Sequence, residues 1–69
     1  MPLTMAPVGE TFEIVKITGK DDVRQHLAEL GFVIGATVKV VNSVAGNLII
    51  QIKESRVALD KAMAGRIII

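Results

Sequence analysis

The amino-acid sequence predicts a mainly β fold, a small barrel of about five antiparallel strands with one α-helix inserted after the first strand. Three observations predict it. Apolar residues alternate along several short segments, glycine and other turn residues separate these segments, and one segment carries the helical period of 3.6 residues. A chain of 69 residues has room for one small domain, so residues 1–69 are expected to form a single unit.

The first expected strand covers residues 11–18, and its apolar pattern changes phase near the middle. Phe12 and Ile14 share one parity, whereas Val15 and Ile17 share the other. Successive side chains of a strand point to opposite faces, so one regular strand cannot bury both pairs on the same side. The pattern therefore predicts a bulge or a sharp bend near Ile14 and Val15, as a strand that wraps a small barrel requires.

The segment with helical periodicity is residues 21–30. Its apolar residues recur at i, i+4 and i+7 and form a narrow stripe of Val23, Leu27 and Leu30. The flanking residues also favour a helix here. We expect Asp21 or Asp22 to supply the N-cap oxygen. We also expect Gly31 to adopt the left-handed conformation after the helix, so that Phe32 closes onto Leu27.

The second half of the chain is predicted to hold the remaining strands, each of them short. A turn with a positive φ at Gly35 precedes them. A loop is expected over residues 42–47, and Asp60 is expected to cap a single helical turn that ends at Gly65. The expected strands are residues 37–41, 48–53, 56–59 and 66–69. This order of elements fits an SH3-like barrel, whose closed form leaves few exposed strand edges.

Apolar residues make up 51% of the chain, which is more than a small core explains. Assigning inward faces gives an expected core of Phe12, Ile14, Val23, Leu27, Leu30, Val38, Val40, Ile50, Ile52, Val57, Leu59 and Ile67. Four apolar residues then lack an inward place, and we expect them to contact a partner or a second copy of the chain. These residues are Val41, Val44, Ile49 and Ile68.

Composition argues against several classes of protein. The longest uncharged stretch, residues 40–52, includes four polar residues and falls short of the roughly 20 apolar residues of a membrane span. No signal peptide is visible, so a cytoplasmic protein is the expectation. The net charge is +1 and the chain has no Trp or Tyr, so nucleic acid is not the expected partner.

The chain has few residues of the types that enzymes use in catalysis, so we do not expect it to be an enzyme. The chain has no cysteine and a single histidine, His26, and Ser43 and Ser55 are distant from it in sequence. No nucleophile elbow, phosphate-binding loop or zinc-protease motif is present.

One set of polar residues has the spacing of a metal site. Asp22, His26 and Glu29 fall at i, i+4 and i+7 on one flank of the expected helix. Their oxygen and nitrogen donors suit Fe(II) or another divalent transition metal. The same spacing is ordinary for the solvated flank of an amphipathic helix, and no second histidine accompanies it. Both interpretations stay open, and no cofactor is required by the sequence.

Three segments resemble those of the ferrous iron transport protein A (FeoA) family. They are residues 24–32 (RQHLAELGF), 35–40 (GATVKV) and 55–59 (SRVAL), and the resemblance extends over almost the whole chain. Two positions depart from the family pattern. Glu54 stands where Gly is common, and Ile34 stands where Pro is frequent. If the turn at Glu54 needs a positive φ, Glu54 is strained or the turn has changed type.

The resemblance implies a cytoplasmic SH3-like accessory protein of ferrous iron uptake. Such a protein contacts the membrane Fe(II) transporter and its cytoplasmic G domain, and is associated with the inner membrane through that partner. Two alternatives remain, a metal-responsive regulatory module and an RNA-binding small barrel. RNA binding would use a basic stripe, for which the candidates are Lys39, Lys53, Arg56 and Arg66.

Overall fold

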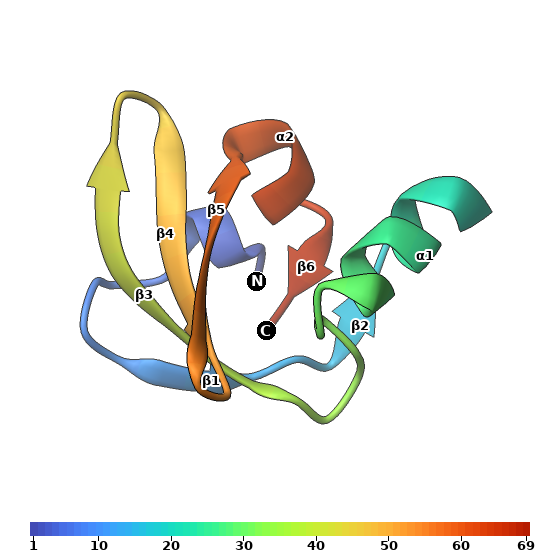
Figure 1. The fold of residues 1–69 in the computed structure, drawn as a ribbon, viewed down its shortest axis with the longest axis horizontal. Helices are drawn as coiled ribbons and strands as arrows, with labels where there is room; N and C mark the ends of the chain where they lie inside the picture. The colour runs from blue at the N-terminus through green and yellow to red at the C-terminus, as the bar shows by residue number, and fades with distance from the viewer.

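Two antiparallel β-sheets enclose one core in the computed structural model, which describes residues 1–69 (Figure 1). The four-stranded sheet has the order β1-β3-β4-β5, formed by Thr11–Glu13, Thr37–Val44, Asn47–Ile52 and Ser55–Asp60. The two-stranded sheet pairs β2 with β6, which are Lys16–Ile17 and Ile67–Ile68. The helices are the 3₁₀-helix η1 (Leu3–Met5), α1 (Asp21–Glu29) and α2 (Lys61–Ala64). The mainly β prediction with a helix after the first strand region is confirmed.

The first expected strand, residues 11–18, is divided into two strands, and the predicted bend near Ile14 and Val15 is where the chain changes sheets. The N–H of Ile14 donates to the carbonyl of Ala36 at 2.9 Å, and the Ile14 carbonyl accepts from Gly35 at 2.8 Å. The next N–H, of Val15, donates instead to the carbonyl of Ile68 at 2.9 Å. The hydrogen bonding therefore changes from one sheet to the other at the Ile14–Val15 peptide, between the end of β1 and the start of β2.

Helix α1 begins at Asp21, and the expectation that Asp21 or Asp22 is the N-cap is wrong. The N-cap is Lys20, whose extended backbone (φ −73°, ψ 164°) is followed directly by the first helical residue. Asp22 instead accepts a hydrogen bond from the N–H of Val23 at 2.9 Å, and Asp21 forms an ion pair with Arg24. Both carboxylates lie in the first turn, where they complement the positive end of the helix dipole.

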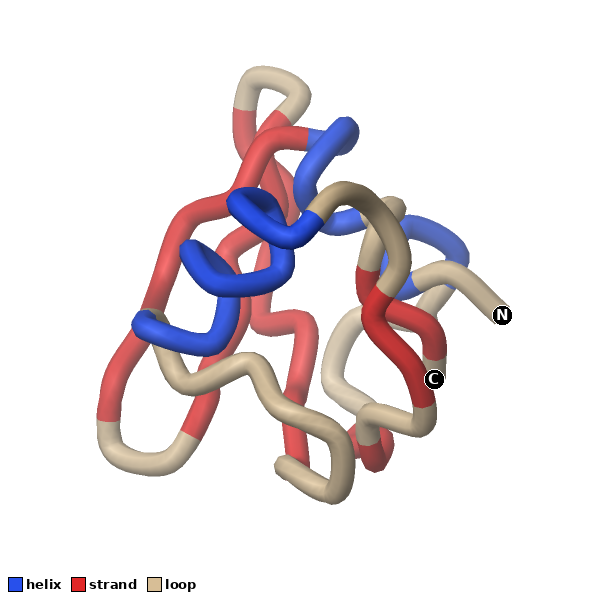
Figure 2. The backbone as a smooth tube through the Cα atoms, turned by 90° about the vertical axis from the view of Figure 1, so that its right-hand side faces the viewer, coloured by secondary structure: helices blue, strands red, loops and turns tan.

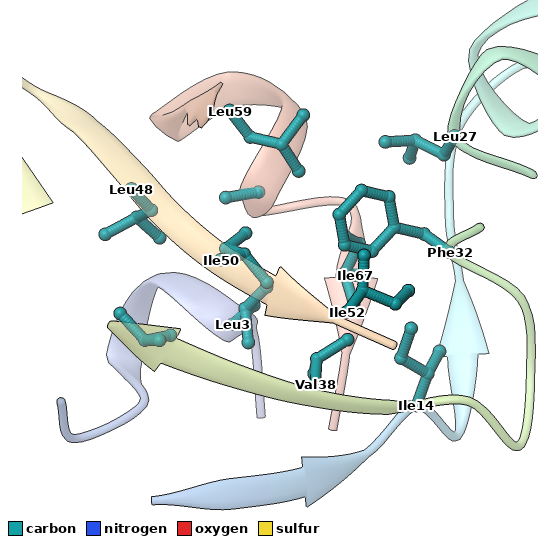
Figure 3. Packing of buried hydrophobic residues seen from close by; sticks show 12 residues of the cluster. Leu3, Ile14, Leu27, Phe32, Val38, Leu48, Ile50, Ile52, Leu59 and Ile67 are labelled. Carbon is teal, nitrogen blue, oxygen red and sulfur yellow. The ribbon is translucent and has the colours of Figure 1, made fainter. Parts of the chain in front are cut away.

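The end of α1 confirms the predicted left-handed cap. Gly31 has φ +101°, and its N–H donates to the carbonyl of Ala28 at 2.9 Å. The N–H of Phe32 donates to the carbonyl of Leu27, also at 2.9 Å. This pair of hydrogen bonds is the Schellman motif, which turns the chain back so that Phe32 covers Leu27. Both side chains are fully buried and lie next to each other in Figure 3.

The expected loop over residues 42–47 is wrong, because most of it is strand. Strand β3 continues to Val44, and β4 begins at Asn47. The connection is a two-residue turn in which Ala45 has φ 51° and Gly46 has φ 83°. Positive φ at both central residues is the requirement of a type I′ turn, whose twist matches that of the flanking strands.

The β3–β4 hairpin includes one bulge, at Val41. Val40 pairs with Ile50, but the next pair is Asn42 with Ile49, so Val41 has no residue opposite it. A bulge of this kind bends a strand and increases its twist.

The following turn has its left-handed residue at Lys53, with φ 54°, whereas Glu54 is not at positive φ. The departure from the family pattern at Glu54 therefore places no left-handed strain on that residue. Asp60 caps α2 as predicted, because its carboxylate accepts from the N–H of Met63 at 2.8 Å.

Twelve buried side chains form the core, and all of them are apolar (Figure 3). The ring of Phe32 lies beside Ile52 and Ile67, which joins the region after α1 to both sheets. Four expected core residues are half-buried at its edge, namely Phe12, Val23, Leu30 and Val57. Four buried residues were missing from the expected core, namely Leu3, Phe32, Leu48 and Ala64.

The two ends of the chain lie side by side (Figures 1 and 2). The amino group of Met1 donates to the carbonyl of Ile69 at 2.7 Å, and the N–H of Ile69 donates to the carbonyl of Met1 at 2.8 Å. Pro2 and Ile68 form the adjoining bridge, so the ends extend the β2–β6 sheet. No helix has the length and apolar character needed to cross a membrane.

Phe32→Ala is expected to lower the free energy of unfolding by about 3–5 kcal/mol, because it opens a cavity among closely packed aliphatic groups. Phe12→Ala is the matched control and is expected to cost about 1–2 kcal/mol, since Phe12 is half-buried. Urea unfolding followed by circular dichroism measures both values. Equal losses for the two variants would contradict the central place of Phe32.

Ala45→Asn is expected to raise the free energy of unfolding by up to about 1 kcal/mol, because an L-residue in the left-handed region is strained and Asn tolerates it best. Gly46→Ala is expected to lower it by about 1 kcal/mol. A Cβ at Gly46 would meet no atom within 4 Å, so only backbone strain is added. Thermal unfolding of the two variants checks the turn, and an unchanged or lower stability of Ala45→Asn would contradict it.

Candidate interaction surface

A shallow concavity of about 280 Å³, lined mostly by polar residues, lies on the outer face of the four-stranded sheet. Its lining is Thr11, Thr37, Val38, Lys39, Gln51 and Lys53. None of these residues is aromatic, so the concavity is not the aromatic groove with which SH3 domains hold proline-rich peptides. Its hydroxyl, amide and ammonium groups instead suit a polar or anionic ligand.

The structure brings together three of the four apolar residues expected to contact a partner. Val41, Val44 and Ile49 all belong to the β3–β4 hairpin. Val44 is 52% exposed, and the other two are half-buried without packing against the core. Ile68 is also half-buried, but it lies in β6 of the other sheet. The contact role of these residues stays a prediction.

Sequence reasoning missed a second exposed apolar group around residues 33–34. Ile34 is 69% exposed and Val33 is 44% exposed, on the turn before β3. The hydrogen bond from Gly35 to Ile14 brings this turn next to Val15, which is 54% exposed. The available signal was the turn assignment itself, because side chains on tight turns point outward.

Met5 and Val8 form a third exposed apolar group, at 68% and 59% exposure. Met5 ends η1, and Val8 lies in the segment that joins η1 to β1. The N–H of Gly9 donates to the carbonyl of Val40 at 2.8 Å, so this segment runs past β3. The sequence offers no periodic pattern here from which the exposure could be predicted.

The expected metal residues Asp22, His26 and Glu29 are all exposed on α1. The structure does not bring them, or any other three His, Asp or Glu side chains, into an arrangement that could hold a metal ion. His26 also lies in the last turn of α1, where a basic side chain complements the helix dipole. Metal binding on this flank stays a prediction.

The expected basic stripe is divided between two parts of the surface. Lys39, Lys53 and Arg56 lie on the four-stranded sheet or its turn, whereas Arg66 precedes β6. The carbonyl of Arg66 accepts from Thr18, which ties it to the two-stranded sheet. Arg24 and Asp21 form the one ion pair of the structure, so none of these four basic residues is neutralised by a carboxylate.

The FeoA domain family model matches residues 1–69. A protein of Methanocaldococcus jannaschii, provisionally named Fe(2+) transport protein A, is 32% identical over 68 residues, which are 99% of this chain and 83% of that protein. The crystal structure of an iron uptake regulatory protein (FeoA) is 36% identical, with a TM-score of 0.88 over 96% of this chain and 88% of that one. Stenotrophomonas maltophilia FeoA complexed with zinc, described as a prokaryotic SH3 domain protein, is 27% identical, with a TM-score of 0.85 over 99% of this chain and 87% of that one.

The metal hypothesis for α1 predicts that His26→Ala abolishes saturable binding of Fe(II) or Zn(II), because the imidazole is the only nitrogen donor on that flank. Anaerobic isothermal titration calorimetry of the wild type and the variant measures the effect. Gln25→Ala on the same helix is the control. No binding heat from the wild type, or the same isotherm from the wild type and His26→Ala, would contradict the site.

Proposed function

The chain belongs to the FeoA family, and from this membership we propose that it is a cytoplasmic accessory protein of ferrous iron uptake. It acts by protein–protein contact with the membrane Fe(II) transporter and the transporter's cytoplasmic G domain, through which it is held at the inner membrane. The proposal rests on one observation, the match of the FeoA domain model to residues 1–69.

The surface supports a role in binding rather than in catalysis. The concavity on the four-stranded sheet has no histidine or carboxylate among its lining residues. Aliphatic side chains are exposed at Val44 on the β3–β4 hairpin and at Val33 and Ile34 on the turn before β3. Aliphatic surface rimmed by charged groups is the usual composition of a protein interface.

A metal-responsive form of the same role is the second candidate, and one observation favours it. The related Stenotrophomonas maltophilia protein was crystallised with zinc. In this chain, the donors available for such a response are those on the flank of α1, including His26. Under this alternative, Fe(II) binding on α1 would change the contact with the transporter.

Deleting the gene is expected to slow Fe(II) uptake by the cell, because the transporter loses its accessory protein. Expression of the wild-type chain in the deleted strain is expected to restore uptake, and an empty vector is not. Uptake of radioactive Fe(II) under anaerobic conditions measures the rate. Uptake of a metal ion other than Fe(II) by the same strains is the matched control, and its rate is expected to be unchanged.

The purified wild-type chain is expected to retain the intact transporter in a pull-down, and to retain the isolated G domain in at least one nucleotide state. Unchanged uptake in the deleted strain, together with no retention in any nucleotide state, would overturn the proposed function.

A further inference from the structure

The register of the four-stranded sheet aligns polar and basic residues into one row across its outer face. Thr11 pairs with Lys39, Lys39 pairs with Gln51, and Gln51 pairs with Arg56. Neighbouring strands lie about 4.8 Å apart, so the row spans roughly 14 Å. Lys53 lies in the turn after β4 and lines the same concavity as Lys39. Three cationic side chains therefore face one patch of the sheet.

A second row lies beside the basic row, and we call it the apolar row because two of its three residues, Ile49 and Ala58, are apolar. After the bulge at Val41, Asn42 pairs with Ile49, and Ile49 pairs with Ala58. Ile49 alternates with the buried Leu48 and Ile50, so its side chain lies on the outer face, where it is half-buried and does not pack against the core. The register shift at the bulge also places Val44 on this face, because Val44 then pairs with the exposed Asn47 and not with a core residue.

The outer face is not covered by the rest of the molecule. Figure 1 shows α1, α2 and the β2–β6 sheet on the other side of the four-stranded sheet. Exposed carboxylates beside the basic row include Glu13, which pairs with Thr37, and Glu54, which follows Lys53. Neither forms an ion pair with a basic residue. The positive charge of the row is therefore left for a ligand to neutralise.

We infer that this outer face is the docking surface for an acidic segment of a partner protein. Carboxylates of the segment bind Lys39, Lys53 and Arg56, and its aliphatic side chains pack on Ile49 and Ala58. The inference rests on the proposed function, since it names the surface by which the chain contacts the transporter. It places the contact on the four-stranded sheet rather than on α1 or on the turn around Ile34.

Charge complementarity and the apolar row both favour a protein segment over RNA. Single-stranded RNA is held largely by stacking on exposed aromatic side chains. The aromatic residues here are Phe12, which is half-buried, and Phe32, which is fully buried. An aliphatic row beside unneutralised ammonium and guanidinium groups instead matches a peptide that alternates acidic and aliphatic residues.

The first test measures binding of the full chain to the purified transporter. Lys39→Glu/Lys53→Glu is expected to weaken binding at least tenfold, because like charges then face each other across the contact. Lys16→Glu/Lys20→Glu has the same change in charge on β2 and at the start of α1, and is expected to bind within about twofold of the wild type. Ile49→Ser is expected to weaken binding more than Ile34→Ser. All four altered residues of the charge variants are exposed, so circular dichroism is expected to show folded protein.

The second test does not depend on the transporter. A peptide of alternating Glu and Leu residues is titrated into the ¹⁵N-labelled chain, and amide shifts are expected at Lys39, Ile49 and Gln51 rather than on α1. Binding is expected to weaken as NaCl is raised.

The outcomes separate the surface from the function. If the wild type and Lys39→Glu/Lys53→Glu bind the transporter equally well, the proposed docking surface is overturned, but the proposed function is kept. Peptide shifts on the sheet without any transporter binding would keep the surface and overturn the proposed function. Absence of peptide shifts on the sheet would overturn the surface. Tight binding of poly(U) that displaces the peptide would also overturn it, because the face would then serve RNA.

Discussion

The fold depends on the Ile14–Val15 peptide, where the chain leaves the four-stranded sheet and joins the two-stranded sheet, so that the barrel closes. The backbone of Ile14 is hydrogen-bonded to Gly35 and Ala36, just before β3, whereas the N–H of Val15 donates to Ile68 of β6. The two-stranded sheet consists of two residues per strand, so it is too short to hold its place by its own ladder. The backbone step between Ile14 and Val15 and the shared apolar core therefore hold the two sheets together. Ile14, on one side of this step, is buried, and Val15, on the other side, is exposed.

The core explains how the remaining elements are held. It has no polar side chain, and no buried side-chain nitrogen or oxygen lacks a partner. Helix α1 contributes one fully buried residue, Leu27, and is anchored by the turn that carries Phe32. Val23 packs against the edge of the core, and the polar residues of the helix are exposed. Binding groups can therefore vary on α1 and on the outer face of the sheet without disturbing the packing of the barrel.

The sequence predicts those features that depend on local chemistry. The Schellman cap at Gly31 and the Asp60 cap follow from residue types at fixed spacing, and the break near Ile14 follows from parity. The turn at Ala45 was missed because alanine is not a typical left-handed residue, and Asn42 and Ser43 are typical of loops. Lys39, Lys53 and Arg56 were predicted as candidates for a basic stripe. The alignment of Lys39 and Arg56 with Thr11 and Gln51 in one row was missed, for a different reason. It depends on the strand register, and the bulge at Val41 that shifts this register has no mark in the sequence.

The two ends of the chain are adjacent, which is the geometry that a domain needs in order to be inserted into a loop of another protein. Because Met1 and Ile69 exchange backbone hydrogen bonds, a polypeptide can enter and leave the domain at nearly one point in space. A larger protein could therefore accommodate the barrel within a surface loop without stretching its own fold. For the same reason, joining the two ends with a short linker and opening the chain at the exposed Ala45–Gly46 turn would give a circular permutant with the same core and the same outer face.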